Sequence, residues 1–372
     1  MSLDPNDRRK LEGLLAELIT VIEDFLRTGL TTASETTRQT FNVTFQEASR
    51  LRLLRLGSTL RLANDEMGKL IKNDADFSRS RFAFFLNRAW LLARGLLKAL
   101  QANDDAAFDK LLWTPPSQPI PKVEVVVVGV VKKVVPRTFV AFDFRLRLTA
   151  PTGAMPAGQR ISWSCVFPLK PDQDVPAEAF LHLPHKQKFT ASQFLEGKTM
   201  VLEKVAIALD DAGGARLSLG VQSTVRTGTA VGVGDYDRFL SWDVARALER
   251  IDKHEPSPFD LDVELQEEIV LRNWSIGDPE SRDADKQTWY PFTESGVAIT
   301  GVASAQDDGK SQRKYLDEIS KKKPAPLFGL LHYEKCRLMF QPLTLFGPKG
   351  PVHLMLSPDK VDRATLLKAL KF

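Results

Sequence analysis

The sequence predicts a multidomain α+β protein, because three successive segments of the chain have different residue patterns. From about Pro5 to Trp113, apolar residues recur at spacings of three and four with no internal proline, which is typical of helices. Runs of β-branched and alternating residues dominate residues 123–226. Strand and helix patterns mix in residues 235–372. We therefore expect an N-terminal helical bundle, a central antiparallel β domain and a small C-terminal α+β domain.

The N-terminal domain, residues 1–113, should contain three or four helices packed as a bundle. The first helix carries a single apolar stripe formed by Leu11, Leu14, Leu15, Leu18, Ile19, Ile22 and Leu26. A second, long helix is expected from about Ser34 to Lys72, after several residues that can cap it. Ser78 can cap a third helix that runs to about Leu100.

The same domain holds the most basic stretch of the chain. Between Arg50 and Lys98 there are eleven basic residues against four acidic ones, a local surplus of seven positive charges. Arg81, Arg88 and Lys98 of the third helix are candidates to hold the phosphates of a nucleic acid. The alternative is an ordinary solvated helix face whose long side chains cover the edges of the core.

The third helix is also rich in aromatic residues, more than one buried face needs. Phe82, Phe84, Phe85 and Trp90 alternate with its basic positions. Either this helix is central to the bundle, or its aromatic face is a docking surface for a protein partner.

A proline-rich segment separates the helical domain from the β domain. Residues 114–122 read TPPSQPIPK, with four prolines in nine residues. Such a composition predicts a stiff, extended linker and marks the clearest domain boundary in the chain.

The β domain, residues 123–226, begins with two strands. Glu124–Val135 is a β-branched run that Gly129 interrupts, which predicts a long strand with a bulge or a sharp bend. Phe139–Leu148 alternates, so its phenylalanines and leucines should face the core while Asp143, Arg145 and Arg147 face water. The turn at residues 136–138 should join the two strands as a hairpin.

Three more strands and a short helix complete this domain. We expect a strand over Arg160–Leu169, a helix over Ala191–Glu196, and a hairpin of Met200–Leu209 with Arg216–Val225.

Three strands, a helix and two strands, with a bent glycine-containing first strand, resemble an OB-fold β-barrel. The resemblance covers roughly 100 residues, includes no family motif and is one of fold only. It implies oligonucleotide or oligosaccharide binding on the face of the second and third strands, through Arg145, Arg147, Arg160 and Trp163. The alternative places Trp163 in the core and leaves the arginines as solvated strand residues.

The C-terminal domain, residues 235–372, follows a connector of small residues. We expect helices over residues 236–251, 310–322 and 359–370, strands over residues 297–303 and 352–356, and a bent strand or hairpin over residues 327–346. Between Asp243 and Glu268 nine acidic residues stand against three basic ones. This acidic segment could face the basic bundle or a basic partner.

Metal, cofactor and catalytic motifs are absent from the sequence. His182 and His185 have an H-x-x-H spacing, but Pro184 places them in a loop and no cysteine completes a zinc site. Cys165 and Cys336 are the only cysteines, too few for a disulfide framework. We therefore expect no metal, no cofactor and no catalytic residue that the sequence can name.

The favoured hypothesis is a non-enzymatic binding protein that contacts nucleic acid, preferentially single-stranded, through the barrel and the basic helices. The net charge of +4 permits an anionic partner. The alternatives are an adaptor subunit of a protein assembly and, third, an enzyme without a recognisable motif. No apolar run of about 18 residues predicts a membrane span, and the acidic residues of the first helix argue against a signal segment, so a cytoplasmic location is expected.

Overall fold

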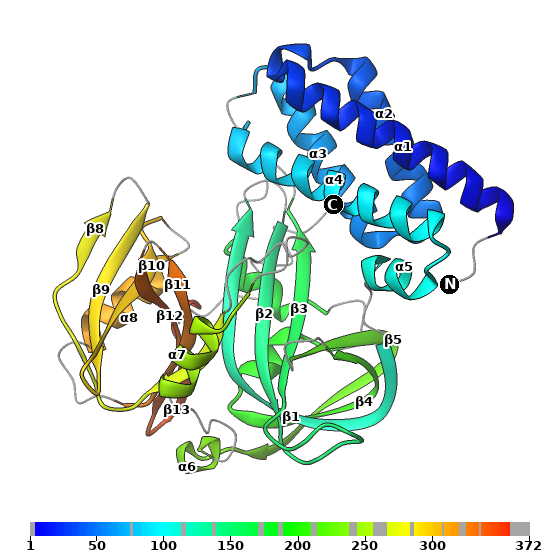
Figure 1. The fold of residues 1–372 in the computed structure, drawn as a ribbon. Helices are drawn as coiled ribbons and strands as arrows, with labels where there is room; N and C mark the ends of the chain where they lie inside the picture. Colours follow the sequence, from blue (N-terminus) through cyan, green and yellow to red (C-terminus); the bar gives the residue numbers. More distant parts are fainter. Residues whose placement is uncertain are drawn as a thin grey trace. The chain divides into compact units, whose positions relative to one another are not determined.

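The computed structural model describes residues 4–74, 77–112, 117–135, 139–169, 175–184, 189–209, 214–237, 244–255, 266–282, 286–306, 309–319, 325–334 and 336–357. They form two compact units, one of residues 4–112 and one of residues 117–357 (Figure 1). The mixture of helices and sheets confirms the α+β class.

The first unit is helical, as predicted. Its helices are α1 (Pro5–Thr28), α2 (Glu35–Arg50), α3 (Leu54–Ile71), α4 (Arg79–Gln101) and α5 (Asp105–Leu112), with a short 3₁₀ turn η1 (Leu30–Thr32). The predicted N-caps form, because the hydroxyls of Ser34 and Ser78 accept hydrogen bonds from the backbone N–H of Thr37 and Arg81.

The long helix expected from Ser34 to Lys72 is instead two helices, α2 and α3. Arg52 lies in the left-handed region with φ of 57°, and the N–H of Leu53 donates to the carbonyl of Ala48 over 2.8 Å. Leu51 and Leu53 are both buried. Two residues spaced by two cannot both face the core from one straight helix, so the chain turns between them.

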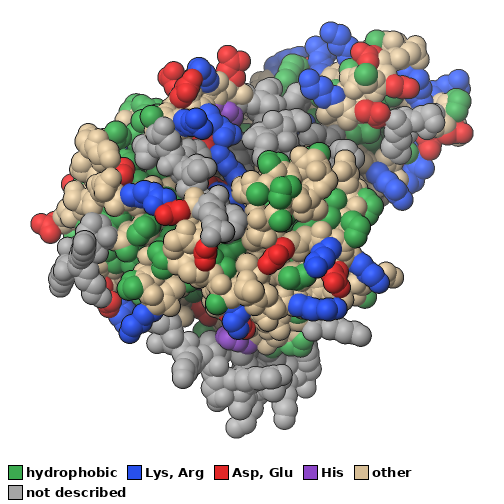
Figure 2. Space-filling view, turned by 90° about the horizontal axis from the view of Figure 1, so that it is seen from below, with side chains coloured by type: hydrophobic (Ala, Val, Ile, Leu, Met, Phe, Trp, Pro, Cys, Tyr) green, Lys and Arg blue, Asp and Glu red, His purple; other side chains and the backbone are tan. Residues whose placement is uncertain are grey.

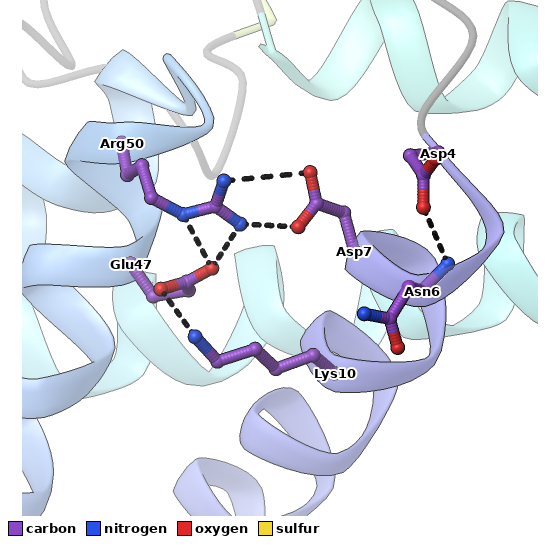
Figure 3. A network of polar contacts seen from close by, with 6 residues as sticks. All are labelled: Asp4, Asn6, Asp7, Lys10, Glu47 and Arg50. Atoms are coloured by element: carbon purple, nitrogen blue, oxygen red, sulfur yellow. Dashed lines mark hydrogen bonds and ion pairs between the residues drawn. The ribbon is translucent and has the colours of Figure 1, made fainter.

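A charged network ties α1 to α2 (Figure 3). Glu47 is buried and accepts hydrogen bonds from Lys10 Nζ at 3.0 Å and from Arg50 Nε at 2.8 Å. Arg50 also donates to Asp7. The Arg50 hydrogen bond, aided by Lys10, outweighs burial and holds the pKa of Glu47 below its ordinary value.

Helix α4 is central to the bundle. Phe82 and Phe85 are buried, and Phe82 meets the Phe25 ring edge-on with centroids 5.6 Å apart. The half-buried Trp90 donates its indole N–H to Glu23 of α1 over 2.9 Å. Of the two hypotheses for this aromatic helix, the structure therefore favours a core position over a docking surface.

The second unit begins with an OB-like barrel. Its strands are β1 (Ser117–Val135), β2 (Phe139–Leu148), β3 (Arg160–Pro168), β4 (Lys198–Leu209) and β5 (Ala215–Ala230), drawn in cyan and green in Figure 1. The sheet closes in the order β1-β2-β3-β5-β4. The 3₁₀ turns η2 (Ala177–His182) and η3 (Ala191–Leu195) lie between β3 and β4 in the sequence and contribute Phe180 and Phe194 to the barrel core.

Strand β1 starts within the segment expected to be a linker. Residues 117–122 pair with β4, with Pro119 opposite Ala206. Proline fixes φ at a value compatible with extended backbone, and its missing N–H matters only where a partner strand needs that donor. Pro119 and Pro121 are therefore compatible with the extended backbone of β1.

Gly129 produces the predicted bulge in β1. The register with β2 shifts between Val127 and Gly129. A Cβ atom at Gly129 would lie 2.6 Å from Cε1 of Phe328, so only glycine lets that ring pack against the strand. The outer face of β1 is thus buried against the second sheet, which explains why its valine run is apolar on both faces.

The second sheet has the order β6-β11-β12-β10-β9-β7, with β13 paired to β12 and β8 to β9. Its strands are β6 (Glu267–Leu271), β7 (Trp274–Ile276), β8 (Glu280–Arg282), β9 (Gln287–Glu294), β10 (Val297–Ser304), β11 (Leu327–Glu334), β12 (Arg337–Gly347) and β13 (Gly350–His353). Helices α6 (Val233–Tyr236), α7 (Val244–Asp252) and α8 (Lys310–Ile319) accompany it.

The strands of the second sheet match the sequence analysis only in part. Strand β10, the β11–β12 hairpin and helix α8 were expected, whereas β6 to β9 were not. In place of one helix over residues 236–251, the described residues form the short α6 and α7. The helix expected over residues 359–370 and the turn at residues 136–138 lie outside the described residues.

Candidate functional site

The site begins with two adjacent glutamates of β6. Glu267 and Glu268 are 0% and 5% exposed, although both carry carboxylates. They are held there because β6 pairs with β11 and its next residues, Ile269 and Leu271, enter the core of the second sheet. A buried carboxylate is costly unless cations and hydrogen bonds compensate its charge.

Arg147 of β2 supplies the first of these cations. Its guanidinium donates to the carboxylate of Glu268 and, through Nη1, to the Leu146 carbonyl at 3.0 Å. Arg147 is 1% exposed. Burial alone would raise the pKa of Glu268, but Arg147, Arg145 and Arg160 outweigh it and hold this pKa below its ordinary value.

Three more arginines surround the two carboxylates. Arg160 of β3 lies 3.0 Å from one oxygen of Glu267, and Arg250 of α7 lies 3.2 Å from the other. Arg145 of β2 is only loosely paired, since its Nη1 lies 3.8 Å from Glu268. Its Nε is buried and has no hydrogen-bond partner among the described residues.

These groups line a small pocket where the barrel meets the second sheet, which we call the arginine pocket. Its volume is about 130 Å³, and its lining consists of Arg145, Arg160, Ile161, Ser162, Gly214, Ala215, Arg250, Gln266, Glu267 and Glu268. Arg147 lies behind Glu268. The four arginines against two glutamates leave a local surplus of two positive charges. An arrangement of this kind can bind an anion.

Of the four barrel residues proposed to bind nucleic acid, Arg145 and Arg160 line this pocket, Arg147 lies behind it and Trp163 is inside the barrel. Arg145 and Arg160 lie in its wall, with side chains 26% and 25% exposed. Arg147 was expected to face water, yet β6 covers it. The nucleic-acid hypothesis required Trp163 at the surface, but it is 4% exposed and stacks on Phe144 and Phe194 inside the barrel.

The reason for the Trp163 correction is its register on β3. Trp163 pairs with Phe144, an inward position of β2, and side chains opposite each other on neighbouring strands share a face. The alternative that placed Trp163 in the core is therefore the correct one.

The three candidates on the helical unit do not form one basic stripe. Arg81 is paired with the buried Glu66 at 2.7 Å, Arg88 is only 5% exposed, and Lys98 is exposed. Lysine and arginine are also interspersed with acidic side chains on the face of the molecule drawn in Figure 2. These observations fit the solvated-face alternative better than a phosphate-binding stripe.

Sequence inspection missed Arg250, Glu267 and Glu268 as parts of the site. The two glutamates belong to the acidic segment between Asp243 and Glu268, which was expected to face the basic bundle or a basic partner. The signal that could have separated them is the EEIVL pattern, since an apolar run directly after two acids predicts a buried strand. Their pairing with Arg147 needs the tertiary structure.

Metal chemistry finds no support in the part of the chain that the structure describes. No group of three or more histidine, cysteine, aspartate or glutamate side chains there could hold a metal ion. Within those residues, no helix combines the length and the apolar character needed to cross a membrane.

No protein-family model and no curated protein matches the chain. Solved structures resemble it weakly. One, described as "Molecular basis for abrogation of activation of pro-inflammatory cytokines", has 10% identity and a TM-score of 0.27, covering 61% of this chain and 92% of its own. The tetrameric p202 HIN2 structure has 9% identity and a TM-score of 0.26, covering 61% and 91%. A murine DNA-binding protein bound to double-stranded DNA has 6% identity and a TM-score of 0.27, covering 64% and 96%. Likenesses at these TM-scores support no functional argument.

Proposed function

We propose that this chain binds nucleic acid, preferentially single-stranded, and that the arginine pocket contacts its phosphates. The observation that carries the proposal is the surplus of two positive charges on the β2–β3 face of an OB-like barrel. OB-folds generally bind oligonucleotides on that face, and because β6 covers Arg147 here, the proposed contact is confined to the arginine pocket.

The chemistry of the pocket favours phosphate as the bound group. Arginine presents planar donors that match phosphate oxygens, and Arg145 is only loosely paired, with its Nη1 3.8 Å from Glu268 and its side chain 26% exposed. Trp163 is enclosed in the core, so it cannot stack on a base. Binding should therefore depend on phosphate contacts and vary little with base sequence.

On the helical unit, Lys98 stays a secondary candidate because it is exposed. Arg81 already compensates Glu66, and Arg88 is buried, so neither is assigned a phosphate contact.

Fluorescence anisotropy with a labelled single strand and the matching duplex tests the proposal. The variant combines Arg145→Gln with Arg250→Gln, and the control is Arg226→Gln, whose side chain lies on β5 and is 70% exposed. We expect the double variant to bind about tenfold or more weakly, which corresponds to roughly 1.4 kcal/mol of binding free energy. Equal affinity of the double variant and the wild-type chain would refute the assignment.

A protein-binding role is the second candidate, and Val221 favours it. Residues 220–223 bulge from β5 opposite Lys204, and Ser223 Oγ accepts from the Gly220 N–H while donating to the Lys204 carbonyl. This bulge presents Val221 with 81% of its surface exposed. Size-exclusion chromatography of a Val221→Ser variant, compared with the wild-type chain, tests whether this side chain supports self-association.

A further inference from the structure

We infer that the arginine pocket binds a phosphomonoester, the terminal phosphate of a nucleic-acid strand, and not the diester phosphates along the strand. The inference rests on the proposed function and specifies its ligand. It assigns to the pocket a preference for strand ends that carry phosphate.

Charge matching is the first argument. Arg145, Arg147, Arg160 and Arg250 face two carboxylates, which gives these six side chains a net charge of +2. A phosphomonoester carries about −1.5 to −2 at pH 7. A diester phosphate carries a single negative charge. The monoester therefore compensates the surplus more completely than one diester does.

The size of the pocket is the second argument. Its volume of about 130 Å³ is well below the roughly 300 to 1,000 Å³ of pockets that enclose whole small molecules. Strands β2, β3 and β5 form one side, and β6 with α7 forms the other. A pocket of this volume accommodates a single phosphate group but not a whole nucleotide.

The third argument concerns which arginine of the pocket can still donate hydrogen bonds to a ligand. Glu267 is held by Arg160 and Arg250, and Glu268 by Arg147, so these pairs set the charge of the pocket. Arg145 is the exception, because its closest carboxylate oxygen is 3.8 Å from Nη1 and its side chain is 26% exposed. Arg145 is thus the residue best placed to bind an incoming phosphate, with Arg250, 44% exposed, beside it.

Three versions of one internally labelled single strand test the inference: one with a 5′-phosphate, one with a 3′-phosphate, and one with hydroxyls at both ends. We expect a phosphorylated strand to bind about tenfold tighter than the hydroxyl strand, and inorganic phosphate to compete away the difference. Arg145→Gln should abolish the difference, while Arg226→Gln should keep it. Thermal unfolding first verifies that Arg145→Gln folds, and Arg250→Gln, at a more exposed position, provides a second variant.

The possible failures are distinct. If all three strands bind equally and Arg145→Gln weakens each of them, the terminal-phosphate inference is overturned while nucleic-acid binding stands. If no strand binds but inorganic phosphate raises the unfolding temperature of the wild-type chain and not of Arg145→Gln, both nucleic-acid proposals fall and the pocket binds phosphate from another source. If phosphate has no effect on binding or on unfolding, the pocket is not a phosphate site.

Discussion

Arg147 on β2 donates to the carboxylate of Glu268 on β6, which lies 121 residues later, and both side chains are buried. This ion pair fixes the second sheet against the β2–β3 face of the barrel. It also explains why the surrounding arginines do not all face water. The functional proposal depends on it, because the pair forms the back of the arginine pocket.

Removing the carboxylate charge should destabilise the second unit strongly. Glu268→Gln leaves Arg147 buried without a counter-charge, and breaking one half of a buried pair typically costs about 3 to 5 kcal/mol. Urea denaturation, followed by circular dichroism, measures the loss. The matched control is Glu203→Gln, since Glu203 is 33% exposed and its pair with Arg226 should contribute no more than about 1 kcal/mol. A cost for Glu268→Gln as small as that of the control would show that the pair is not buried in solution.

Gly129 should tolerate no side chain. In Gly129→Ala the new Cβ would lie 2.6 Å from the Phe328 ring and 3.3 Å from Leu343 Cδ1, so one of these must move. Overpacking of this kind costs about 1 to 3 kcal/mol. Phe328→Leu in the same chain should recover part of the loss, which a double-mutant cycle detects. Gly234→Ala, where a Cβ meets nothing within 4 Å, should change the free energy of unfolding very little. A Gly129→Ala variant as stable as Gly234→Ala would contradict the packing of Phe328 on β1.

His353 should make stability fall in mild acid. Burial lowers the pKa of His353 to about 4, from an ordinary value of about 6.5. Between these pH values the unfolded chain binds a proton that the folded chain does not. The contribution of His353 to the free energy of unfolding is therefore fully present above about pH 6.5 and is lost as the pH falls towards 4. When the pH is lowered from about 7.5 to about 5, the free energy of unfolding of the wild-type chain should fall by roughly 2 kcal/mol more than that of His353→Gln, as measured by urea denaturation at each pH. If the free energies of unfolding of the two proteins changed with pH in parallel, burial would not lower the pKa of His353.

Trp163 should be irrelevant to ligand binding but important for stability. Because its ring stacks on Phe144 and Phe194, Trp163→Phe should cost about 1 to 3 kcal/mol of folding free energy through incomplete filling of the core. The affinity for a labelled single strand should stay within about twofold of the wild-type value. A large loss of affinity in a folded Trp163→Phe variant would restore Trp163 as a residue that touches the ligand.

Local pattern predicted much of the barrel. The alternation from Phe139 to Leu148 located β2 with its correct ends, and the single glycine in the valine run located the bulge of β1. These elements could be predicted because the alternation of a strand and the backbone freedom of a glycine are determined within a few residues of sequence. The break between α2 and α3 was missed, since Arg52 adopts a positive φ without a glycine to signal it.

The site was harder to predict, because its charges are paired across the two sheets. Alternation assigned Arg147 to the outer face of β2 correctly, but no local pattern shows that β6 covers that face. For the same reason, the acidic segment that contains Glu267 and Glu268 was matched to the basic bundle or a basic partner and not to the arginines of the barrel. A charged residue on a strand face is solvated or paired according to which distant element packs there.

The most direct test of the central claim is the salt dependence of single-strand binding, measured by anisotropy for the wild-type chain and for Arg145→Gln with Arg250→Gln. If the arginine pocket holds a phosphate, the slope of log affinity against log salt should be shallower in the double variant by about 0.7 for each phosphate that it no longer neutralises. The Arg226→Gln control should keep the wild-type slope. Identical slopes in all three proteins, with unchanged affinity, would contradict the claim that the arginine pocket binds phosphate.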